Sequence, residues 1–573
     1  MRTADPAADR TAHIPRPAAP PAVPLVEVRA LRVGFGRADR PPAVKSVSFD
    51  LHAGRCLAIV GESGSGKSVT ARALIGLAGR GARVEAERLR IQGRDVIGQS
   101  ERAWRALRGR TIGYVLQDAL VSLDPLKTVG SEVTEGLFVH GAVRRGERAA
   151  RAAELLRRVG VPDPELKARQ LPHELSGGQR QRALIAAALA LDPDILVADE
   201  PTTALDATIQ AQVLALLDDI RARGKTLVLI SHDLAVVARM ADEVLIMRHG
   251  EVVEHGPAAK VFAAPAHPYT RALIDAVPSA HSRGARLAPA AAPRFHAASS
   301  TLARPDRSAA AVVARAPLLA ADGLVKSFRR PDGSSAAVVH DVSFSIARGE
   351  ALGIVGESGS GKSTVARLVL ALETPDAGAV RLDGQPWSAL AEAERRPRRR
   401  DVSVVYQDPL SHFDPRWTVE RIIADALPRG EDRSARAARV GELLDLVGLP
   451  DGFRARRPLD LSGGQRQRAA IARAIAPGAR LIVCDEPVSA LDVSIQAQVL
   501  DLLADLKAEL GVSYLFISHD LGVVHHLCDR VLVLKAGRVV EQGPSDDVFL
   551  RPVHPYTREL VAAVPRLGAG RAA

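Results

Sequence analysis

The chain has 573 residues, of which 47% are apolar, 25% charged and 3% aromatic, and its formal net charge is +11. These proportions are typical of soluble globular proteins and exclude a collagen-like, fibrous or wholly disordered chain. Three isolated cysteines, Cys56, Cys484 and Cys528, exclude a disulfide scaffold and form no CxxC pair. We therefore expect no zinc site and no iron–sulfur cluster. Since no basic patch is interleaved with aromatic residues, we expect no nucleic-acid partner.

The first 24 residues are rich in Ala, Pro and Arg and lack the apolar core of a signal peptide. We expect this N-terminal segment, residues 1–24, to be disordered. No uninterrupted run of about 18 apolar residues predicts a transmembrane helix. The sequence therefore predicts a cytoplasmic protein that associates with membranes only through a partner.

The rest of the chain is an internal duplication. Five motifs recur in the same order, at offsets of 295, 286, 286, 287 and 287 residues. They are GESGSGKS from Gly61 and Gly356, LSGGQRQRA from Leu175 and Leu461, DEPTTALD and DEPVSALD from Asp199 and Asp485, ISHDL from Ile230 and Ile517, and HPYTR from His267 and His554. We predict a first domain over residues 25–278, an Ala/Pro/Arg-rich linker over 279–316 and a second domain over 317–573.

Short apolar runs alternate with helix-forming stretches in each repeat. We predict buried strands over residues 56–60, 195–199, 226–230, 351–355, 481–485 and 514–517. Continuous apolar strands that alternate with helices indicate an α/β fold with a mainly parallel sheet covered on both faces. Ligands of such sheets bind at the carboxyl ends of the strands, and the motifs fall at these ends or at helix starts.

A phosphate loop follows the first of these strands in each repeat. Its backbone N–H groups and the start of the following helix bind phosphate, its lysine reaches the phosphate oxygens, and its serine holds Mg²⁺. The candidate residues are Gly61, Ser63, Gly64, Gly66, Lys67 and Ser68 in the first repeat and Gly356, Ser358, Gly359, Gly361, Lys362, Ser363 and Thr364 in the second.

Acidic, amide and imidazole side chains follow the other strands. An aspartate that ends an apolar strand suits the Mg²⁺ shell, and the next glutamate is placed to polarise an attacking water as a general base. A glutamine amide can ligate Mg²⁺ or the water, and a neutral histidine can hydrogen-bond the γ-phosphate. The metal candidates, beside the loop serines, are Asp199, Asp485, Gln117 and Gln407, and the catalytic candidates are Glu200, Glu486, His232 and His519.

The LSGGQ segments predict a second anion site in each repeat. A serine hydroxyl, bare backbone N–H groups and a helix N-terminus meet there. The residues are Ser176, Gly177, Gly178 and Gln179, and Ser462, Gly463, Gly464 and Gln465. A domain with one phosphate loop has no obvious use for a second γ-phosphate site of its own. We infer that this site faces the nucleotide of a neighbouring domain.

Together these motifs resemble the ATP-binding cassette (ABC) ATPases, in both repeats. The resemblance implies two tandem cassettes, each with a helical subdomain, that pair head to tail and hold ATP and Mg²⁺ between the phosphate loop of one and the LSGGQ segment of the other. It implies that Asp206 and Asp492 are D-loop aspartates that link the two sites, and that Phe35 and Phe328 lie against adenine. Since no core motif is degenerate, we expect two hydrolysis-competent sites, in which ATP closes the pair and its hydrolysis to ADP and phosphate opens it.

Two further segments in each repeat indicate which kind of ABC ATPase the chain resembles. Residues after Gln117 and Gln407, and the HPYTR segments, resemble the ATPase subunits of bacterial importers for dipeptides, oligopeptides, nickel or glutathione. That implies two transmembrane permease subunits docked beside residues 117–130 and 407–420, an external solute-binding protein, and a peripheral location at the cytoplasmic face of the plasma membrane. Some members carry a cysteine cluster in the HPYT extension, but residues 279–316 and 566–573 contain no cysteine, so we expect none.

Other functions of tandem-cassette proteins predict sequence features that can be compared with this chain. A soluble tandem-cassette ATPase that acts on ribosomes fits the charge but usually has a long, charged, helical linker, unlike residues 279–316. A DNA-repair ATPase would need zinc-type cysteine spacings. A sugar-importer ATPase shares the layout but not the HPYT extensions, and a purely structural role would tolerate decayed motifs. The ribosomal and sugar-importer functions remain the alternatives, and the substrate within the importer class stays open.

Overall fold

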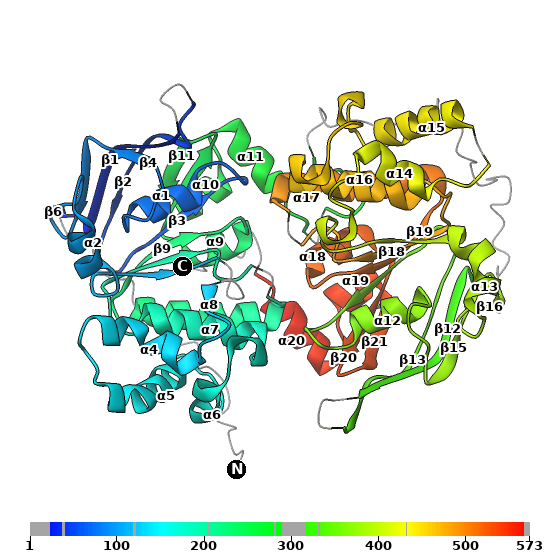
Figure 1. Cartoon of the computed structure of the whole chain (residues 1–573), viewed down its shortest axis with the longest axis horizontal. Helices are drawn as coiled ribbons and strands as arrows, with labels where there is room; N and C mark the ends of the chain where they lie inside the picture. The colour runs from blue at the N-terminus through cyan, green and yellow to red at the C-terminus, as the bar shows by residue number, and fades with distance from the viewer. Residues whose placement is uncertain are drawn as a thin grey trace, which may run out of the picture.

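Two α/β lobes lie side by side in the computed structural model (Figure 1). The structure describes residues 23–36, 40–117, 122–203, 205–279, 282–288, 317–329, 333–430, 432–489 and 491–565. Nearly all of the predicted disordered segment and most of the predicted linker lie outside these ranges. In the described ranges, no helix has both the length and the apolar character needed to cross a membrane.

A parallel sheet forms the centre of the first repeat. Its strands lie in the order β10, β3, β9, β8, β7 and are largely buried. Their bounds are β3 (Cys56–Val60), β7 (Ile112–Val115), β8 (Ile195–Asp199), β9 (Thr226–Ile230) and β10 (Glu243–Arg248). The strands predicted over 56–60, 195–199 and 226–230 are thus confirmed with the same bounds.

An antiparallel layer, which the sequence analysis did not predict, extends this sheet. Its central strand β1 pairs with β2, β4 and β5, and β11 joins β2 to β10. The bounds are β1 (Val26–Phe35), β2 (Val44–Leu51), β4 (Ala82–Glu85), β5 (Arg88–Ile91), β6 (Arg94–Asp95) and β11 (Glu251–Pro257). In β2 and β5, buried and exposed residues alternate, which is the pattern of strands with one covered face.

The helices of the first repeat flank the sheet and build a separate helical subdomain. In that subdomain α4, α5, α6 and α7 pack against one another. The helices are α1 (Lys67–Ala73), α2 (Glu101–Leu107), α4 (Val129–Val139), α5 (Arg148–Arg158), α6 (Pro164–Arg169), α7 (Gly177–Ala188), α8 (Ala207–Ala222), α9 (Leu234–Met240), α10 (Ala258–Ala263) and α11 (Pro268–Asp275), with 3₁₀ turns η1 (Arg145–Glu147) and η2 (Pro172–Glu174).

The second repeat has the same plan. Strands β17, β18, β19, β14 and β20 are parallel in that order, with β21 antiparallel at the edge, and β13, β12, β15 and β16 form the antiparallel layer. The bounds are β12 (Leu319–Arg329), β13 (Ser335–Ile346), β14 (Ala351–Val355), β15 (Ala377–Leu382), β16 (Gln385–Pro386), β17 (Val402–Val405), β18 (Leu481–Asp485), β19 (Ser513–Ile517), β20 (Arg530–Lys535) and β21 (Arg538–Pro544). The predictions over 351–355 and 481–485 are confirmed, and the one over 514–517 starts a residue earlier.

The helices of the second repeat follow those of the first, except that a 3₁₀ turn, η7, stands where the first repeat has α6. They are α12 (Lys362–Val369), α13 (Glu392–Arg395), α14 (Val419–Ala426), α15 (Arg433–Leu446), α16 (Gly463–Ile475), α17 (Val493–Leu510), α18 (Leu521–Leu527), α19 (Ser545–Leu550) and α20 (Pro555–Ala563), with η5 (Arg396–Asp401), η6 (Leu410–His412), η7 (Asp451–Phe453) and η8 (Pro458–Asp460).

The last helix of each repeat packs against the other repeat. Helix α11 contacts α17, and α20 contacts α8 (Figure 1). Ala207 and Ala276 of the first repeat belong to the same buried apolar cluster as the core of the second. The HPYT segments therefore lie at the junction of the two repeats.

Residues 282–288, which we call the strap, continue this junction beyond α11. The backbone N–H groups of Leu287 and Ala288 donate to the buried carboxylate of Asp501 in α17, at 3.1 and 3.0 Å. Leu287 and Ala288 are themselves buried in the core cluster of the second repeat. Side-chain contacts join Ser282 to His526, Arg283 to Asp546 and Arg286 to Asp505.

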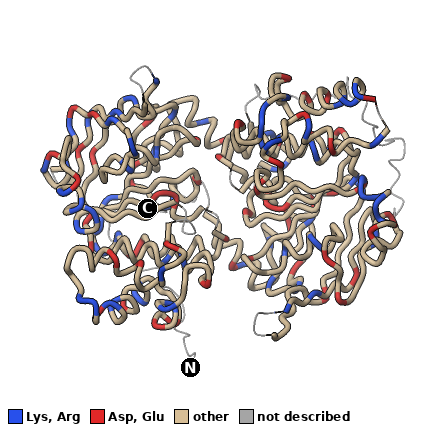
Figure 2. The backbone as a smooth tube through the Cα atoms, viewed as in Figure 1, with Lys and Arg blue, Asp and Glu red and all other residues tan. Residues whose placement is uncertain are grey.

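Both signs of charge are spread over the molecule. Figure 2 shows Lys and Arg interspersed with Asp and Glu along both repeats, with no face of a single sign in this view. The net charge of +11 is therefore not gathered into one patch there.

Candidate active site

Each phosphate loop connects a buried strand to a helix. In the first repeat it runs from the end of β3 at Val60 to the start of α1 at Lys67. Gly66, just before the helix, has φ 100°, and a Cβ there would lie 2.7 Å from the carbonyl oxygen of Ala43. Only glycine fits that position. Gly361 has the same φ in the second repeat, so both loops reach their helix by the same turn.

The loop lysine is buried in both repeats. Lys67 Nζ donates to the carbonyl oxygens of Gly61 and Glu62, at 2.6 and 2.8 Å. Lys362 makes the equivalent two bonds at 2.8 Å. Burial lowers the pKa of both amines, against the opposing effect of nearby carboxylates. Each lysine thus lies inside its loop.

A loop hydroxyl in each repeat is also buried without a hydrogen-bond partner among the described residues: Ser65 Oγ in the first and Ser360 Oγ in the second. An unpaired buried polar group is costly, and a ligand that supplies acceptors removes that cost. Phosphate oxygens are such acceptors. The chemistry of both loops therefore fits a bound phosphate chain.

The strand-ending aspartates lie beside the loop serines. Ser68 Oγ donates to Asp199 Oδ1 at 2.9 Å, and Ser363 Oγ donates to Asp485 Oδ1 at 3.4 Å. Burial raises the pKa of both carboxyl groups. Ser68 and Asp199 are 131 positions apart in the sequence, and Ser363 and Asp485 are 122 apart. Each pair nevertheless meets at the carboxyl end of its parallel sheet, where one strand separates the two strands that the pair follows.

Tyr114 is a site residue that the sequence analysis missed. Its hydroxyl donates to Asp199 Oδ2 at 2.7 Å, and burial strongly raises its pKa. The matching position in β17 of the second repeat is Val404. Because the second copy of the motif has no tyrosine there, comparing the two repeats gave no signal for this residue. The two sites therefore differ in what contacts the aspartate.

The glutamates that follow these aspartates have an unusual backbone. Glu200 and Glu486 have φ of 51° and 48°, in the left-handed region that non-glycine residues seldom adopt. Each is held by a bond from its N–H to the last residue of the neighbouring strand, at 2.9 Å in both repeats. Strain of this kind persists only where neighbours fix it, and it clusters at functional sites.

Polar side chains from several elements converge on each glutamate. Gln117 Nε2 and Thr203 Oγ1 donate to Glu200 Oε2 at 2.8 and 3.1 Å, and His232 Nδ1 lies 3.4 Å from Glu200 Oε1. In the second repeat Gln407 lies 2.9 Å and His519 3.2 Å from the carboxylate of Glu486. The structure thus brings together the predicted base, glutamine and histidine in both repeats.

The histidines and glutamates shift each other's pKa in opposite directions. Burial alone would lower the pKa of His232, but its bond to the Glu200 carboxylate outweighs that effect and the pKa lies above the ordinary 6.5. For Glu200, burial opposes ionisation, yet His232 and Lys67 hold its pKa below the ordinary 4.5. The pair His519 and Glu486 behaves the same way. Each glutamate is therefore an ionised carboxylate near neutral pH.

The aspartates before α8 and α17 cross the junction between the repeats. Asp492 Oδ1 accepts from the backbone N–H of Ser63 at 2.7 Å, and Asp206 Oδ2 accepts from that of Ser358 at 3.1 Å. Ser63 and Ser358 lie in the phosphate loops. Each loop is therefore contacted by the opposite repeat.

Comparison with known proteins agrees with this geometry. The family described as ABC transporter matches residues 44–203 and 339–489. The chain belongs to the ABC transporter family. Its repeats are two ATP-binding cassettes, of the kind that hydrolyse ATP to drive transport. The family described as oligopeptide/dipeptide transporter, C-terminal region, matches residues 253–300 and 540–573, which follow each cassette.

Two curated relatives span nearly the whole chain. The oligopeptide transport ATP-binding protein OppD of Mycobacterium tuberculosis is 41% identical, over 95% of this chain and 98% of that protein. The glutathione import ATP-binding protein GsiA of Salmonella typhimurium is 42% identical, over 94% and 89% respectively. Among solved structures, the dimeric cassette MJ0796 bound to ADP and Pi is 30% identical over 40% of this chain and 98% of that one, with a TM-score of 0.37.

The LSGGQ segment of each cassette begins a helix. Ser176 Oγ accepts from the N–H of Gln179 at 3.3 Å, and the Gln179 side chain accepts from the N–H of Ser176 at 3.1 Å, which is a capping box. Ser462 and Gln465 form the same cap on α16. In both cassettes the serine and the first glycine are exposed and the second glycine is buried. That these exposed groups face the opposite phosphate loop stays a prediction.

The proposed adenine contacts differ between the cassettes. Phe35, at the end of β1, is half-buried against the apolar core. Phe328, near the end of β12, is half-buried with the Lys326 ammonium 5.5 Å from its ring centre. Thr364 follows Ser363 in the first turn of α12 and is half-buried. The roles of these three residues also stay predictions.

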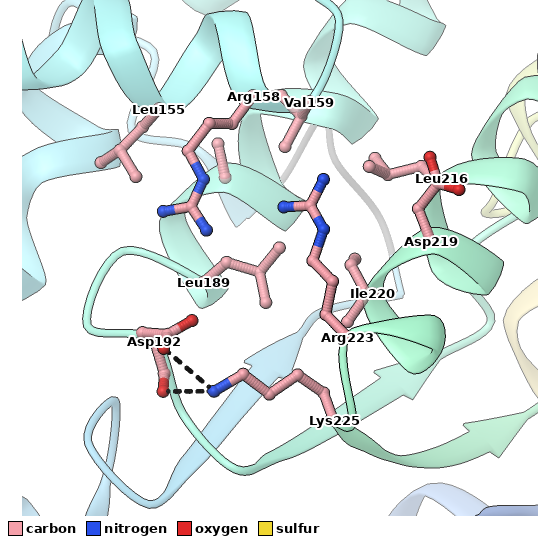
Figure 3. A pocket seen from close by; sticks show the side chains of 11 residues that line it. Leu155, Arg158, Val159, Leu189, Asp192, Leu216, Asp219, Ile220, Arg223 and Lys225 are labelled. Atoms are coloured by element: carbon pink, nitrogen blue, oxygen red, sulfur yellow. Dashed lines mark hydrogen bonds and ion pairs between the residues drawn. The ribbon is translucent and has the colours of Figure 1, made fainter. Parts of the chain in front are cut away.

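A small pocket lies away from these motifs, beside α5, α7 and α8 of the first cassette. It has about 30 Å³ of free volume, enough for water but not for a nucleotide. Figure 3 shows Arg158 and Arg223 pointing into it, while Lys225 pairs with Asp192 at its rim. None of the predicted site residues lines it, so the pocket is separate from the candidate active site.

Proposed function

We propose that this chain is the ATP-hydrolysing subunit of an importer for peptides, of the oligopeptide or dipeptide class, with glutathione or nickel as further substrates of that class. The relatives OppD and GsiA support the class of substrate, as does the transporter C-terminal region after each cassette. The alternatives, a ribosomal ATPase or a sugar-importer ATPase, do not account for an oligopeptide/dipeptide transporter C-terminal region after each cassette. The contact of each D-loop aspartate with the opposite phosphate loop is the observation that supports joint action of the two cassettes.

In the proposed site, each ATP lies between the cassettes. The phosphate loop with Lys67 would face Ser462, Gly463 and Gly464, and the loop with Lys362 would face the same LSGGQ residues of the first cassette, Ser176, Gly177 and Gly178. The two lysines would exchange their loop carbonyl partners for phosphate oxygens. The LSGGQ serines are exposed and begin α7 and α16. They and the N-termini of these helices would offer donors to the γ-phosphate from the other side.

The residues beside each loop fit a Mg²⁺ ion. A hydroxyl and a carboxylate, Ser68 with Asp199 and Ser363 with Asp485, are hard oxygen ligands of the kind Mg²⁺ takes together with phosphate oxygens. Gln117 and Gln407 direct their amide nitrogens at the glutamates, which leaves each amide oxygen for the ion or its water. When bound, Mg²⁺ neutralises charge on the phosphate oxygens.

The chain's own residues then supply the rest of the hydrolysis. Glu200 and Glu486, held ionised, would accept a proton from the attacking water. The glutamines and histidines fix the carboxylates in position, and the histidines would also hydrogen-bond the γ-phosphate. After hydrolysis the γ-phosphate no longer joins the two cassettes, and the pair opens.

The proposed partners are membrane permease subunits, two of them by the resemblance, with an external solute-binding protein beyond. Residues 117–130 and 407–420 would receive them, although 118–121 lie outside the described residues. Leu126 supports this assignment because its side chain is 89% exposed, which leaves an apolar group open to a partner. The chain would then work at the cytoplasmic face of the membrane.

Gentle purification of the tagged chain from detergent-solubilised membranes, followed by mass spectrometry, tests this proposal. We expect two multi-span membrane proteins to co-purify, and their loss when Leu126 is changed to Asp. Leu166→Asp, at another exposed leucine, in α6, is the control and should keep them. Ribosomal proteins without membrane subunits would overturn the importer function in favour of the soluble alternative.

A further inference from the structure

The HPYT motif that follows each cassette has a defined local structure. In the first extension, His267 is the N-cap of α11 and its Nδ1 accepts from the N–H of Tyr269 at 3.1 Å. Pro268 fills the first helical position, where no N–H partner is needed. Glu254 accepts from the N–H of His267 at 3.1 Å. This network fixes where α11 starts and therefore where Tyr269 points.

The second extension repeats the arrangement. His554 Nδ1 accepts from the N–H of Tyr556 at 3.1 Å, and Glu541 accepts from the N–H of His554 at 3.0 Å. Pro555 again occupies the first helical position, in α20. Since α11 and α20 are remote in sequence but built alike, the orientation of the tyrosine is a property of the motif.

Each of these tyrosines reaches the phosphate loop of its own cassette. The hydroxyl oxygen of Tyr269 accepts from the backbone N–H of Glu62 at 3.3 Å, and that of Tyr556 accepts from the N–H of Glu357 at 3.1 Å. Both rings are buried, and a cation lies over each: Arg248 at 4.8 Å and Lys535 at 4.4 Å from the ring centres. The hydroxyls are therefore held in place from several sides.

The residue whose amide each tyrosine contacts is central to its loop. In the first cassette the Glu62 carbonyl accepts from Lys67 Nζ at 2.8 Å and from the N–H of Ser65 at 3.1 Å. The next N–H along the chain, that of Ser63, donates to Asp492 of the other cassette. Two consecutive loop amides are thus bound from outside, one by the cassette's own extension and one by the opposite D-loop.

We propose that Tyr269 and Tyr556 are positioning residues of the two ATP sites: each hydroxyl fixes one phosphate-loop amide, that of Glu62 or Glu357, so that the next amide can meet the D-loop aspartate of the opposite cassette. This rests on the proposed phosphate-loop function. Because α11 packs on α17 and α20 on α8, each extension spans from its own loop to the helix that the opposite D-loop begins. The extension would therefore couple ATP binding to the contact between cassettes.

The test is the full chain with Tyr269→Phe and Tyr556→Phe, singly and together, assayed for ATP hydrolysis and for melting temperature. Phenylalanine keeps the ring and removes only the hydroxyl. We expect the double variant to raise the KM for ATP about 3- to 10-fold, the loss of one neutral hydrogen bond per site. Tyr514→Phe is the matched control, because its buried hydroxyl donates to the carbonyl of Leu503 far from the loops.

The comparison of these variants separates positioning from plain stability. A rise in KM in the double variant, with a melting temperature no lower than that of Tyr514→Phe, supports the proposal. KM and kcat equal to those of Tyr514→Phe overturn it. Lys67→Ala with Lys362→Ala tests the underlying assignment: undiminished binding of a fluorescent ATP analogue would overturn the proposed function and this inference together, whereas lost binding there leaves the tyrosine result to decide the inference alone.

Discussion

The residues of each active site hold one another in conformations they would not adopt alone. The left-handed backbone of Glu200 costs on the order of 1–3 kcal/mol, and its N–H bond to Ile230 and its contacts with Gln117 and His232 keep it there. An ionised carboxylate is thus fixed at the end of a strand next to the Asp199–Ser68 pair. The same constellation stands in the second cassette, which indicates that both sites are built for chemistry.

The His232–Glu200 pair should make stability depend on pH. Because the pKa of His232 is raised above 6.5 and that of Glu200 is lowered below 4.5, the pair stabilises the fold fully between about pH 4.5 and 6.5. As pH rises through the raised pKa of the histidine, that stabilisation is lost. We expect the melting-temperature difference between the wild type and His232→Gln to be larger at pH 6 than at pH 9.

The exposed His173 gives the control for this measurement. His173→Gln should leave the melting temperature close to that of the wild type at both values of pH. If the melting-temperature difference between the wild type and His232→Gln grows from pH 6 to pH 9, the pKa of His232 is not raised in the folded protein.

The second glycine of each LSGGQ segment makes a separate prediction. A Cβ at Gly178 would lie 2.5 Å from Ile209 Cγ2, whereas one at Gly177 would lie 3.9 Å from its nearest neighbour. Gly178→Ala should therefore cost about 1–3 kcal/mol of unfolding free energy by overpacking, and Gly177→Ala should cost much less. Chemical denaturation of the two variants measures this, and equal stability would show that the contact with α8 is not tight.

At the scale of elements, the strap distinguishes two otherwise matched halves. Its partners in the second cassette are Asp501, Asp505, His526 and Asp546, and His525 in turn contacts Asp546. At the equivalent positions in the first cassette stand Ala215, Asp219, Ala238, Arg239 and Ala259. Only one of these is the same residue, so the docking surface exists on the second cassette alone. The segment after α11 is thus matched to the surface on which it lies.

The strap should hold the two cassettes together without nucleotide. If a protease site is placed within residues 289–316 and the chain is cut there, we expect the halves to co-elute in size-exclusion chromatography without ATP. Two charge-assisted bonds to Asp501 are each worth about 1.5–3 kcal/mol, so Asp501→Ala should weaken association at least about tenfold.

Arg286→Ala, on the strap itself, tests the same contact without touching the core of the second cassette. It should also weaken the association, while Asp219→Ala, at the first-cassette position equivalent to Asp505, should not. Halves that separate equally in the wild type and in Asp501→Ala would show that the strap does not hold them.

The sequence predicted those elements whose signal is local or repeated. Strands such as β3 and β8 are continuous apolar runs, and the phosphate loops and glutamates recur at fixed offsets, so their meeting at the sheet edge follows from the fold. Tyr114 could not be found that way because Val404 replaces it in the other half. The docking of the strap was not predicted either, because its composition is that of a linker and its partners are far along the chain. The antiparallel layer around β1 was missed because its alternation is interrupted by bulges.

At the scale of the whole molecule, the two cassettes contact each other at both phosphate loops. The loop of one cassette binds the D-loop aspartate of the other, and each C-terminal extension packs on the opposite half. In the proposed function, closing or opening at one site would therefore move groups of the other. In the proposed function, this arrangement would turn the two nucleotide sites into one switch that acts on the membrane subunits.

The most direct test of this account is the rate of ATP hydrolysis by the full chain with Glu200→Gln, with Glu486→Gln and with both. We expect the double variant to bind ATP yet lose hydrolysis by 100-fold or more, an order-of-magnitude figure for removing a general base. Each single variant should lose about half the rate if the sites are independent and nearly all of it if they are coupled. Full activity in either single variant, or in the double variant, would contradict the assignment of these glutamates as the bases of two working sites.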